Sequence, residues 1–389
     1  MSELNYLEKL LDGADVEWLS LEKILSRTKG TKITAGKMKI LHKDNAPLKI
    51  FAGGKTVAFV DYNDIPEKDI NRKPSIIVKS RGVIEFEFYD KPFSHKNEMW
   101  SYHSKNETIN IKYIYYFLKI NEAHFQKIGC KMQMPQISTP DTDKFRVPIP
   151  CPDNPGKSLD IQSAIVRILD KFTALTAELT AELTARKKQY NYYRDQLLSF
   201  DEGEVEWQML GDLGENLDSK RKPITSGLRE AGSIPYYGAS GIVDYVKDYI
   251  FDGDFLLISE DGANLLARNT PIAFSISGKS WVNNHAHVIK FDSYAGRRYV
   301  EYYLNSIDLA PYISGAAQPK LNKKNLENIR IPNPSPEDKE RIVSILDKFD
   351  ALTNSINEGL PREIELRQKQ YEYYRELLFS FPRSETASN

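Results

Sequence analysis

Two short segments of this sequence end like the phosphate-binding loop of nucleotide hydrolases. Gly54-Lys55-Thr56 and Gly278-Lys279-Ser280 provide the glycine, lysine and hydroxyl that such a loop directs at phosphate and Mg²⁺. The motif also requires an earlier glycine at its start, and this sequence has Lys49 and Ala273 at those places. Neither segment therefore predicts nucleotide binding.

Two histidines have a spacing that suits metal binding. His285 and His287 stand two positions apart in a segment that we expect to form a strand, so both side chains face one side of it. A zinc site needs three or four ligands, and no third ligand is evident nearby. We therefore interpret them as strand histidines with ordinary hydrogen-bond partners.

Four carboxylates, Asp252, Asp254, Glu260 and Asp261, lie close enough in the sequence to form the acid cluster of a nuclease. Glycines interrupt this segment and predict turns, so solvated turn residues are the favoured interpretation. The sequence also lacks the G-x-S-x-G motif, a G-x-G-x-x-G motif after a strand, and the Asn/Asp-Pro-Pro-aromatic tetrapeptide of amino-methyltransferases. It predicts a non-catalytic chain with no cofactor or metal of its own.

Loops rich in Lys, Arg, Asn and Gln remain, and such side chains contact DNA phosphates and base edges. The net charge is −1, from 53 basic and 54 acidic residues, so any basic surface must be local. An ordinary polar surface would have the same composition. The candidate DNA-contacting residues in these loops are Lys55, Arg81, Lys96, Asn97, Lys279, Asn283, Asn284, Gln318 and Lys320.

The elements that must position these loops include one segment that occurs twice. IVRILDKF, from Ile165 to Phe172, matches IVSILDKF, from Ile342 to Phe349. QYNYYRDQLLSF begins at Gln189, and its counterpart QYEYYRELLFSF begins at Gln370. The repeat extends beyond these blocks, because VEW occurs at Val16 and again at Val205. The chain is therefore two tandem halves.

Both copies of the repeated segment have the pattern of long helices. In the second copy apolar residues recur at spacings of three and four, which lays a coiled-coil seam along one face. The first copy should be helical from about Leu159 to Ser199, whereas Gly359 and Pro361 predict a turn inside the second. We expect each seam to pack on the other. The residues expected at this helix-pair and subunit interface are Ile165, Phe172, Leu179, Leu183, Tyr190, Tyr193, Ile342, Phe349, Ile356, Tyr371 and Tyr374.

The remaining segments predict an α+β fold with two globular domains. Runs rich in Val, Ile and Phe, such as 75–79, 255–258, 272–276 and 286–291, alternate with glycine turns and predict short strands. Outside their shared flanks the two globular parts have little sequence in common. The expected division is a helical segment 1–12, a first domain 13–157, a helix 158–200, a second domain 201–334, a helix 335–381 and a tail 382–389.

Two further features concern the compartment. Cys130 and Cys151 are the only cysteines, which suits a reducing cytosol better than a disulfide framework. No apolar run approaches the ~20 residues that span a bilayer. We expect a cytoplasmic protein that does not bind membranes.

At the repeated helices the chain resembles the specificity subunit of type I restriction-modification enzymes, in the IC-like subfamily. The resemblance is carried by the two ILDKF and QYxYYR blocks, by an Ile-Pro-x-Pro sequence before each helix, by LTAELTAELTARKKQY from Leu175, and by GLPREIELRQKQYEYYR from Gly359. It covers both halves.

The resemblance implies two target recognition domains separated by an antiparallel pair of helices with pseudo-twofold symmetry. Each domain would read half of a bipartite, asymmetric site in double-stranded DNA. The helices would set the spacer and dock two methyltransferase subunits, which hold S-adenosylmethionine, and two restriction subunits that use ATP and Mg²⁺ would complete this host-defence complex. A non-catalytic scaffold that joins two protein clients is the alternative, and a nuclease is a third hypothesis.

The unit Thr-Ala-Glu-Leu occurs at Thr176 to Leu179 and again at Thr180 to Leu183. One such unit advances a helix by ~6 Å with a net rotation of ~40°, and one base pair advances DNA by ~3.4 Å with a turn of about 35°. We predict that a third unit lengthens the unspecified spacer, by about one base pair, and leaves both half-sites unchanged. Mapping methylated sites in cells that express the insertion variant with a methyltransferase subunit tests this. An unchanged spacer would show that the helix does not set the distance.

Overall fold

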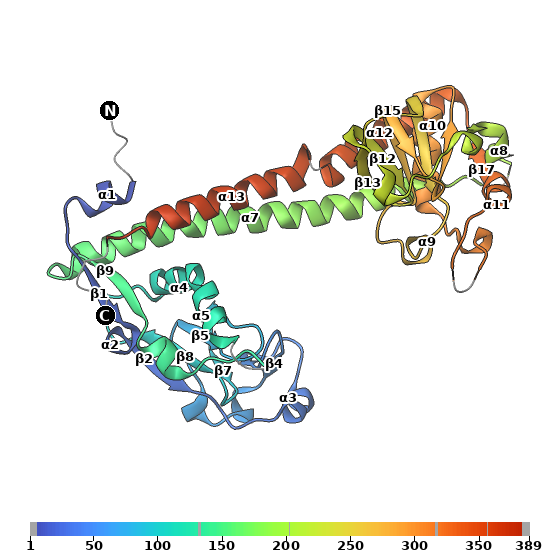
Figure 1. Ribbon diagram of the computed structural model, residues 1–389. Coiled ribbons are helices and arrows are strands. Elements are labelled where there is room, and N and C mark those ends of the chain that lie inside the picture. Colours follow the sequence, from blue (N-terminus) through green and yellow to red (C-terminus); the bar gives the residue numbers. More distant parts are fainter. Residues whose placement is uncertain (1–5, 131–133, 202, 316–317, 356, 383–389) are drawn as a thin grey trace. The chain divides into compact units, whose positions relative to one another are not determined.

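The computed structural model describes residues 6–130, 134–201, 203–315, 318–355 and 357–382. The chain forms two compact units (Figure 1), Met1–Glu178 with Ile364–Asn389, and Leu179–Glu363. Each unit contains one globular domain together with part of the long helices. No helix among the described residues combines the length and the hydropathy that a membrane span requires.

The first unit is built on a four-stranded antiparallel sheet in the order β2-β8-β5-β6. Its strands are β2 (Leu25–Lys29), β8 (Trp100–Ser104), β5 (Ser75–Lys79) and β6 (Glu85–Tyr89). Helices α4 (Ile111–Ile120) and α5 (Glu122–Gly129) cover it, and Tyr113, Ile114 and Phe117 of α4 share its core with Ile76 and Val78. This core holds the sheet against α4.

Smaller elements surround that sheet. A three-stranded sheet has the order β4-β3-β7, and β1 pairs with β9 as an antiparallel ribbon. The bounds are α1 (Tyr6–Leu11), β1 (Val16–Ser20), α2 (Leu21–Ile24), α3 (Ala35–Leu41), β3 (Leu48–Phe51), β4 (Val57–Val60), β7 (Phe93–His95), α6 (Thr139–Asp143) and β9 (Arg146–Pro150).

The second unit contains a six-stranded sheet in the order β11-β16-β14-β15-β12-β13. The strands are β11 (Glu215–Asn216), β16 (Ala286–Lys290), β14 (Phe251–Ser259), β15 (Ala273–Val282), β12 (Ala231–Gly238) and β13 (Gly241–Val246). The other elements are β10 (Glu206–Met209), α8 (Leu210–Leu213), α9 (Asn264–Ala267), α10 (Tyr294–Ser306), α11 (Lys323–Glu327) and β17 (Arg330–Asn333). β13 lies at the edge of the sheet, and its Ile242, Val243 and Tyr245 side chains are 48%, 55% and 52% exposed.

Four strands of each sheet follow one plan. β2-β8-β5-β6 corresponds in order to β11-β16-β14-β15, neighbouring strands are antiparallel in both sets, and α4 and α10 follow the corresponding strands β8 and β16. The sequence suggested that the globular parts share little beyond their flanks. The common strand order shows that the repeat continues into the domains at the level of the backbone, although the side chains have diverged.

The repeated segments form α7 (Pro155–Leu197), and α12 (Pro336–Asn354) followed by α13 (Gly359–Leu378). α7 is one helix of 43 residues that begins four residues before the expected Leu159. The predicted turn in the second copy is present between α12 and α13. Gly359 has φ +74°, and a Cβ there would lie 2.3 Å from the carbonyl oxygen of Ala351, so the turn requires glycine. Pro361 is the third residue of α13.

The repeated segments IVRILDKF and IVSILDKF each pack into the core of a domain. Ile165 and Leu169 of α7 are fully buried in the first core, and Ile342 and Leu346 of α12 are equally buried in the second. In Figure 1, α12 runs beside α10 of its domain. The first turns of each long helix are therefore structural parts of a domain.

The aspartate of each ILDKF block reinforces this attachment. Asp170 accepts from Lys112 Nζ at 2.8 Å and from the Tyr116 hydroxyl at 2.5 Å. Asp347 accepts from Arg298 Nε at 3.0 Å and from the Tyr302 hydroxyl at 2.6 Å. The two attachments use corresponding positions of α4 and α10, which supports an internal duplication.

Aromatic rings join the helices within each unit. In the first, Phe172 of α7 stacks on Tyr374 of α13 with centroids 5.4 Å apart, and in the second, Phe349 of α12 stacks on Tyr193 of α7 at 5.7 Å. Residues that precede Phe172 in α7 share a core with Leu378, which follows Tyr374 in α13. The helices α7 and α13 therefore run antiparallel. The predicted fold class is confirmed.

We predict that Phe172→Ala and Phe349→Ala each lower the free energy of unfolding by about 1 to 3 kcal/mol, because each removes a stacked, half-buried ring. Tyr373→Ala is the matched control, since that side chain is 63% exposed and stacks only at the edge of its neighbour Tyr374. Urea unfolding of the full chain measures both. Equal losses in all three variants would contradict a specific role for the stacked pairs.

Candidate nucleic-acid interface

A basic cleft lies in the first domain, where the end of β2 meets the segment after β7. Its volume is about 800 Å³. Five basic side chains and two acidic ones line it, namely Arg27, Lys29, Lys32, Lys37, Lys68, Asp64 and Asp69. Asn97, one of the predicted DNA-contacting residues, lies in the same lining.

The backbone around Gly30 builds this cleft. Thr31 N donates to His95 O at 2.8 Å, and a Cβ at residue 30 would lie 2.3 Å from that oxygen, so only glycine permits the approach. With its amide nitrogen turned inward, Asn97 donates to the carbonyl oxygens of Gly30 and Thr31 at 3.0 Å. The basic segment after β2 is thus held beside residues 95–97.

The lysines of the cleft carry exposed, uncompensated charge. Arg27 is paired with Asp143. Lys29, Lys32 and Lys37 are exposed, and none of them forms an ion pair with any residue that the structure describes. Unpaired ammonium groups in the lining of one cleft suit the phosphates of a nucleic-acid backbone.

Sequence reasoning missed this cleft, although a signal was present. Residues 23–43 contain seven Lys or Arg residues and no Asp or Glu. The balanced total charge concealed this run, because acidic residues elsewhere cancel it. Charge counted in short windows would have identified it.

The other predicted residues of the first domain lie in separate places. Lys55 is exposed at the tip of the β3–β4 hairpin. Lys96 pairs with Glu98 at 2.6 Å, which reduces its availability for phosphate. Arg81 is exposed and donates from Nε to Gln136 Oε1 at 3.0 Å. Of this set only Asn97 reaches the cleft.

In the second domain the predicted residues divide into exposed and structural ones. Lys279 is exposed with its ammonium over the Tyr249 ring, and Asn284 and Gln318 are also exposed. Asn283, by contrast, is only 6% exposed, and its Oδ1 accepts from His285 N at 2.8 Å. Because this side chain holds a turn, we do not retain it as a DNA contact.

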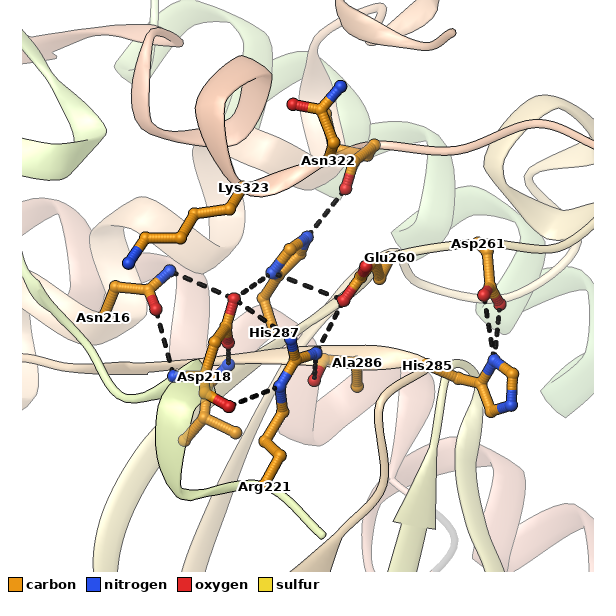
Figure 2. Close-up of polar contacts among 12 residues, drawn as sticks. Asn216, Asp218, Arg221, Glu260, Asp261, His285, Ala286, His287, Asn322 and Lys323 are labelled. Atoms are coloured by element: carbon orange, nitrogen blue, oxygen red, sulfur yellow. Dashed lines mark hydrogen bonds and ion pairs between the residues drawn. The ribbon is translucent and has the colours of Figure 1, made fainter. Parts of the chain in front are cut away.

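Lys320 lies at the exposed edge of a buried charge network, whose other members Asp218, Arg221, Glu260 and His287 are labelled in Figure 2. Glu260 receives Arg221 Nη1 at 2.6 Å and Lys320 Nζ at 3.0 Å, and Arg221 also approaches Asp218 at 3.3 Å. The imidazole of His287 contacts Asp218 Oδ2 through Nδ1 at 2.6 Å. The expectation that Glu260 is a solvated turn residue was wrong, because its partners bury and neutralise it.

The network holds its carboxylates ionised. Burial alone would raise the pKa of Asp218, but the hydrogen bond and the charge of His287, with a backbone N–H donor, hold it below its ordinary value. Burial likewise opposes ionisation of Glu260, whereas hydrogen bonds from Arg221 and Lys320 lower its pKa. The favourable interactions outweigh burial in both cases.

Asp218, Glu260 and His287 place possible metal-ligand atoms within 4.8 Å of one another. The sequence showed no third ligand for the histidines, because Asp218 is distant along the chain. The guanidinium of Arg221 already supplies the positive charge, and His287 Nε2 faces the carbonyl oxygen of Leu321 at 2.7 Å. His285 faces Asp261 instead, at 2.9 Å. The arrangement is an ion-pair network that fixes loops and not a metal centre.

The residues expected at the helix interface also fall into groups. Ile165 and Ile342 belong to domain cores, Leu179 and Leu183 are half-buried, and Ile356 lies outside the described residues. Stacked or tilted rings join Phe172 with Tyr371 and Tyr374, and Phe349 with Tyr190 and Tyr193.

Known proteins resemble the whole chain. The profile of the type I restriction modification DNA specificity domain matches residues 28–186 and 204–366. The EcoR124I/EcoR124II specificity subunit of Escherichia coli is 42% identical over 417 residues, with full coverage of both chains. The EcoprrI specificity subunit, also of Escherichia coli, is 36% identical and covers 92% of this chain and 93% of its own.

Solved structures agree on the fold. The S subunit of a type I restriction-modification system from M. genitalium superimposes with a TM-score of 0.66 at 16% identity, over 96% of this chain and 98% of that one. The two matches of the profile coincide with the two halves of the repeat. The chain is a member of the family of type I restriction-modification DNA specificity subunits.

Proposed function

We propose that each globular domain reads one half of a bipartite, asymmetric DNA sequence, as part of the sequence-specificity role of this family. The chain itself is non-catalytic, like the specificity subunits to which it is related. Its own contribution is therefore binding energy and discrimination. Membership of this family favours this role over the scaffold and nuclease alternatives.

The basic cleft of the first domain is the observation that carries the proposal. Lys29, Lys32 and Lys37 are exposed and unpaired among the described residues; Lys29 is the last residue of the β1-α2-β2 unit, and the other two follow it. Such lysines bind phosphates and supply affinity that does not depend on the sequence. Discrimination must then come from other side chains held at a fixed distance from them.

The second domain has a comparable segment at the corresponding place. Lys220 and Lys222 are exposed and follow the β10-α8-β11 unit, while Arg221 between them turns inward to Glu260. Trp281 Nε1 donates to Lys222 O at 2.6 Å and fixes this segment to β15. Both domains thus place basic residues after the same structural unit.

The long helices are the proposed docking surface for the methyltransferase subunits. The family implies assembly with DNA and with other subunits of the system. The repeated helices support two copies of the methyltransferase subunit, since the QYxYYR block occurs once in each half. We further propose that two restriction subunits join this core, that the partners hold the cofactors, and that the complex acts in the cytoplasm.

We predict that the triple variant Lys29→Ala, Lys32→Ala and Lys37→Ala weakens duplex binding equally for all sequences. The slope of log affinity against log salt should become shallower by about two to three, because each lost phosphate contact removes about 0.9. Salt titrations of the complex reconstituted with methyltransferase subunits measure this. The control changes Lys91, Lys127 and Lys144, which are exposed in the same domain and do not line the cleft. An unchanged slope would remove the cleft from the interface.

The domains should also be exchangeable. We predict that replacing residues 13–154, which end before α7, with the equivalent domain of a relative changes one half-site and preserves the other. Each domain has its own core and its own attachment to a helix. Methylation mapping of the chimera reports both half-sites at once. Alteration of both would argue against independent reading.

A further inference from the structure

The two domains share a turn at equivalent points of their sheets. Residues 80–82 follow β5 and lead toward β6, and residues 260–262 follow β14 and lead toward β15. Both turns end in a glycine with positive φ, +75° at Gly82 and +103° at Gly262. Since β5 and β14 have the same place in the common strand order, the turns correspond.

In the first domain this turn is hydrogen bonded to a segment far along the chain. Ile137 N donates to Ser80 O at 3.0 Å, and Gly82 N donates to Pro135 O at 2.9 Å. The next residue, Ser138, is the N-cap of α6.

In the second domain the same bonds recur with different residues. Leu321 N donates to Glu260 O at 2.7 Å, and Gly262 N donates to Pro319 O at 3.3 Å. Asn322 follows as the N-cap of α11. One backbone arrangement, which we name the bridge frame, therefore occurs in both domains at residues 80–82 with 135–137 and at residues 260–262 with 319–321.

The bridge frame presents one pair of side chains in each domain. Arg81 is bridged to Gln136 in the first and Asp261 to Lys320 in the second. Arg81, Gln136 and Lys320 are exposed, and Asp261 is partly exposed. The aliphatic residues that follow, Ile137 and Leu321, are buried and anchor each frame beneath its exposed pair.

The backbone is common to both domains, but the presented chemistry differs. Arg pairs with guanine O6 and N7, Gln with adenine, Lys with guanine, and Asp accepts from cytosine N4. A carboxylate such as Asp261 would be repelled by phosphate, so contact with the DNA backbone does not explain this position. Two domains that read different half-sites need the same geometry of approach to DNA but different polar groups at the point of contact. The bridge frames provide both.

The pairs are also held in place before DNA binds. In the first domain Arg81 uses Nε for its hydrogen bond to Gln136. Its two Nη groups form no ion pair with a described residue. In the second, His285 contacts the Asp261 carboxylate at 2.9 Å (Figure 2), and Lys320 Nζ pairs with Glu260 at 3.0 Å. Pre-ordering lowers the entropy that binding would otherwise cost.

We propose that Arg81 with Gln136, and Asp261 with Lys320, are the specificity-determining pairs that contact base edges, one pair for each half-site. The inference rests on the proposed function and identifies the residues that distinguish one base sequence from another. The network of Asp218, Arg221 and His287 then acts as a positioning device for the second pair.

Arg81→Lys and Asp261→Asn test the proposal with small changes at the surface. Lysine keeps the charge of Arg81 but loses the two-pronged donor, and asparagine keeps the shape of Asp261 but adds a donor. The matched controls are Arg146→Lys and Asp248→Asn, which lie at exposed positions outside the bridge frames of the same two domains. Each full-length variant is expressed with its methyltransferase subunit, and methylated sites are mapped.

The expected result is a loss of discrimination of about 10- to 100-fold at one position of one half-site, a different half-site for each variant, with the controls unchanged. Equal weakening on all sequences in duplex competition would identify phosphate contacts and overturn the proposal. Unaltered sites in both variants would also overturn it, while the proposed function would stand if the parent complex methylates a defined bipartite site. Absence of any preferred site in the parent complex would refute the proposed function itself.

Discussion

The structure depends on the burial of the repeated segments IVRILDKF and IVSILDKF in the cores of the two globular domains. Ile165 and Leu169 complete the first core, and Ile342 and Leu346 complete the second. A helix whose first turns form part of a core cannot rotate about its axis without unfolding the domain. The surface that each domain presents is therefore fixed relative to its own part of the helix pair.

This attachment also explains how a duplicated chain can read an unequal target. The helices, their aspartate contacts and the four common strands must keep their geometry, because each contributes to a packed core. Side chains at the exposed ends of the strands carry no such constraint. The bridge frames show the boundary, since Ile137 and Leu321 are buried while their neighbours Gln136 and Lys320 are exposed and chemically different.

Sequence reasoning predicted the elements that depend on local periodicity. The helices α7 and α12 and the break at Gly359 were predicted to within a few residues, because apolar spacing and glycine are local signals. Strands β14 and β15 were predicted too short. They run through Gly253 and Gly278, which lie opposite each other in the register and which suggested turns.

The candidate site could be predicted only in part, since its contacts join distant segments. Asp218 and His287 are 69 residues apart in the sequence, and nothing local indicates that they meet. Asn283 is a residue type that often contacts DNA from loops. Its side-chain oxygen, however, accepts a hydrogen bond from His285 N within the turn. The basic run of residues 23–43 needed no structure to be noticed, whereas the bridge frames could not be recognised without the backbone hydrogen bonds.

The exposed edge strand β13 has a consequence for handling the isolated chain. Its outer backbone groups lie at the end of the sheet order, and Ile242, Val243 and Tyr245 are about half exposed along it. An uncovered apolar edge is a template for strand pairing between molecules. The second domain consequently carries an aggregation hazard of its own, and charged substitutions along β13 offer a route to a more soluble preparation that leaves the basic cleft and the bridge frames intact.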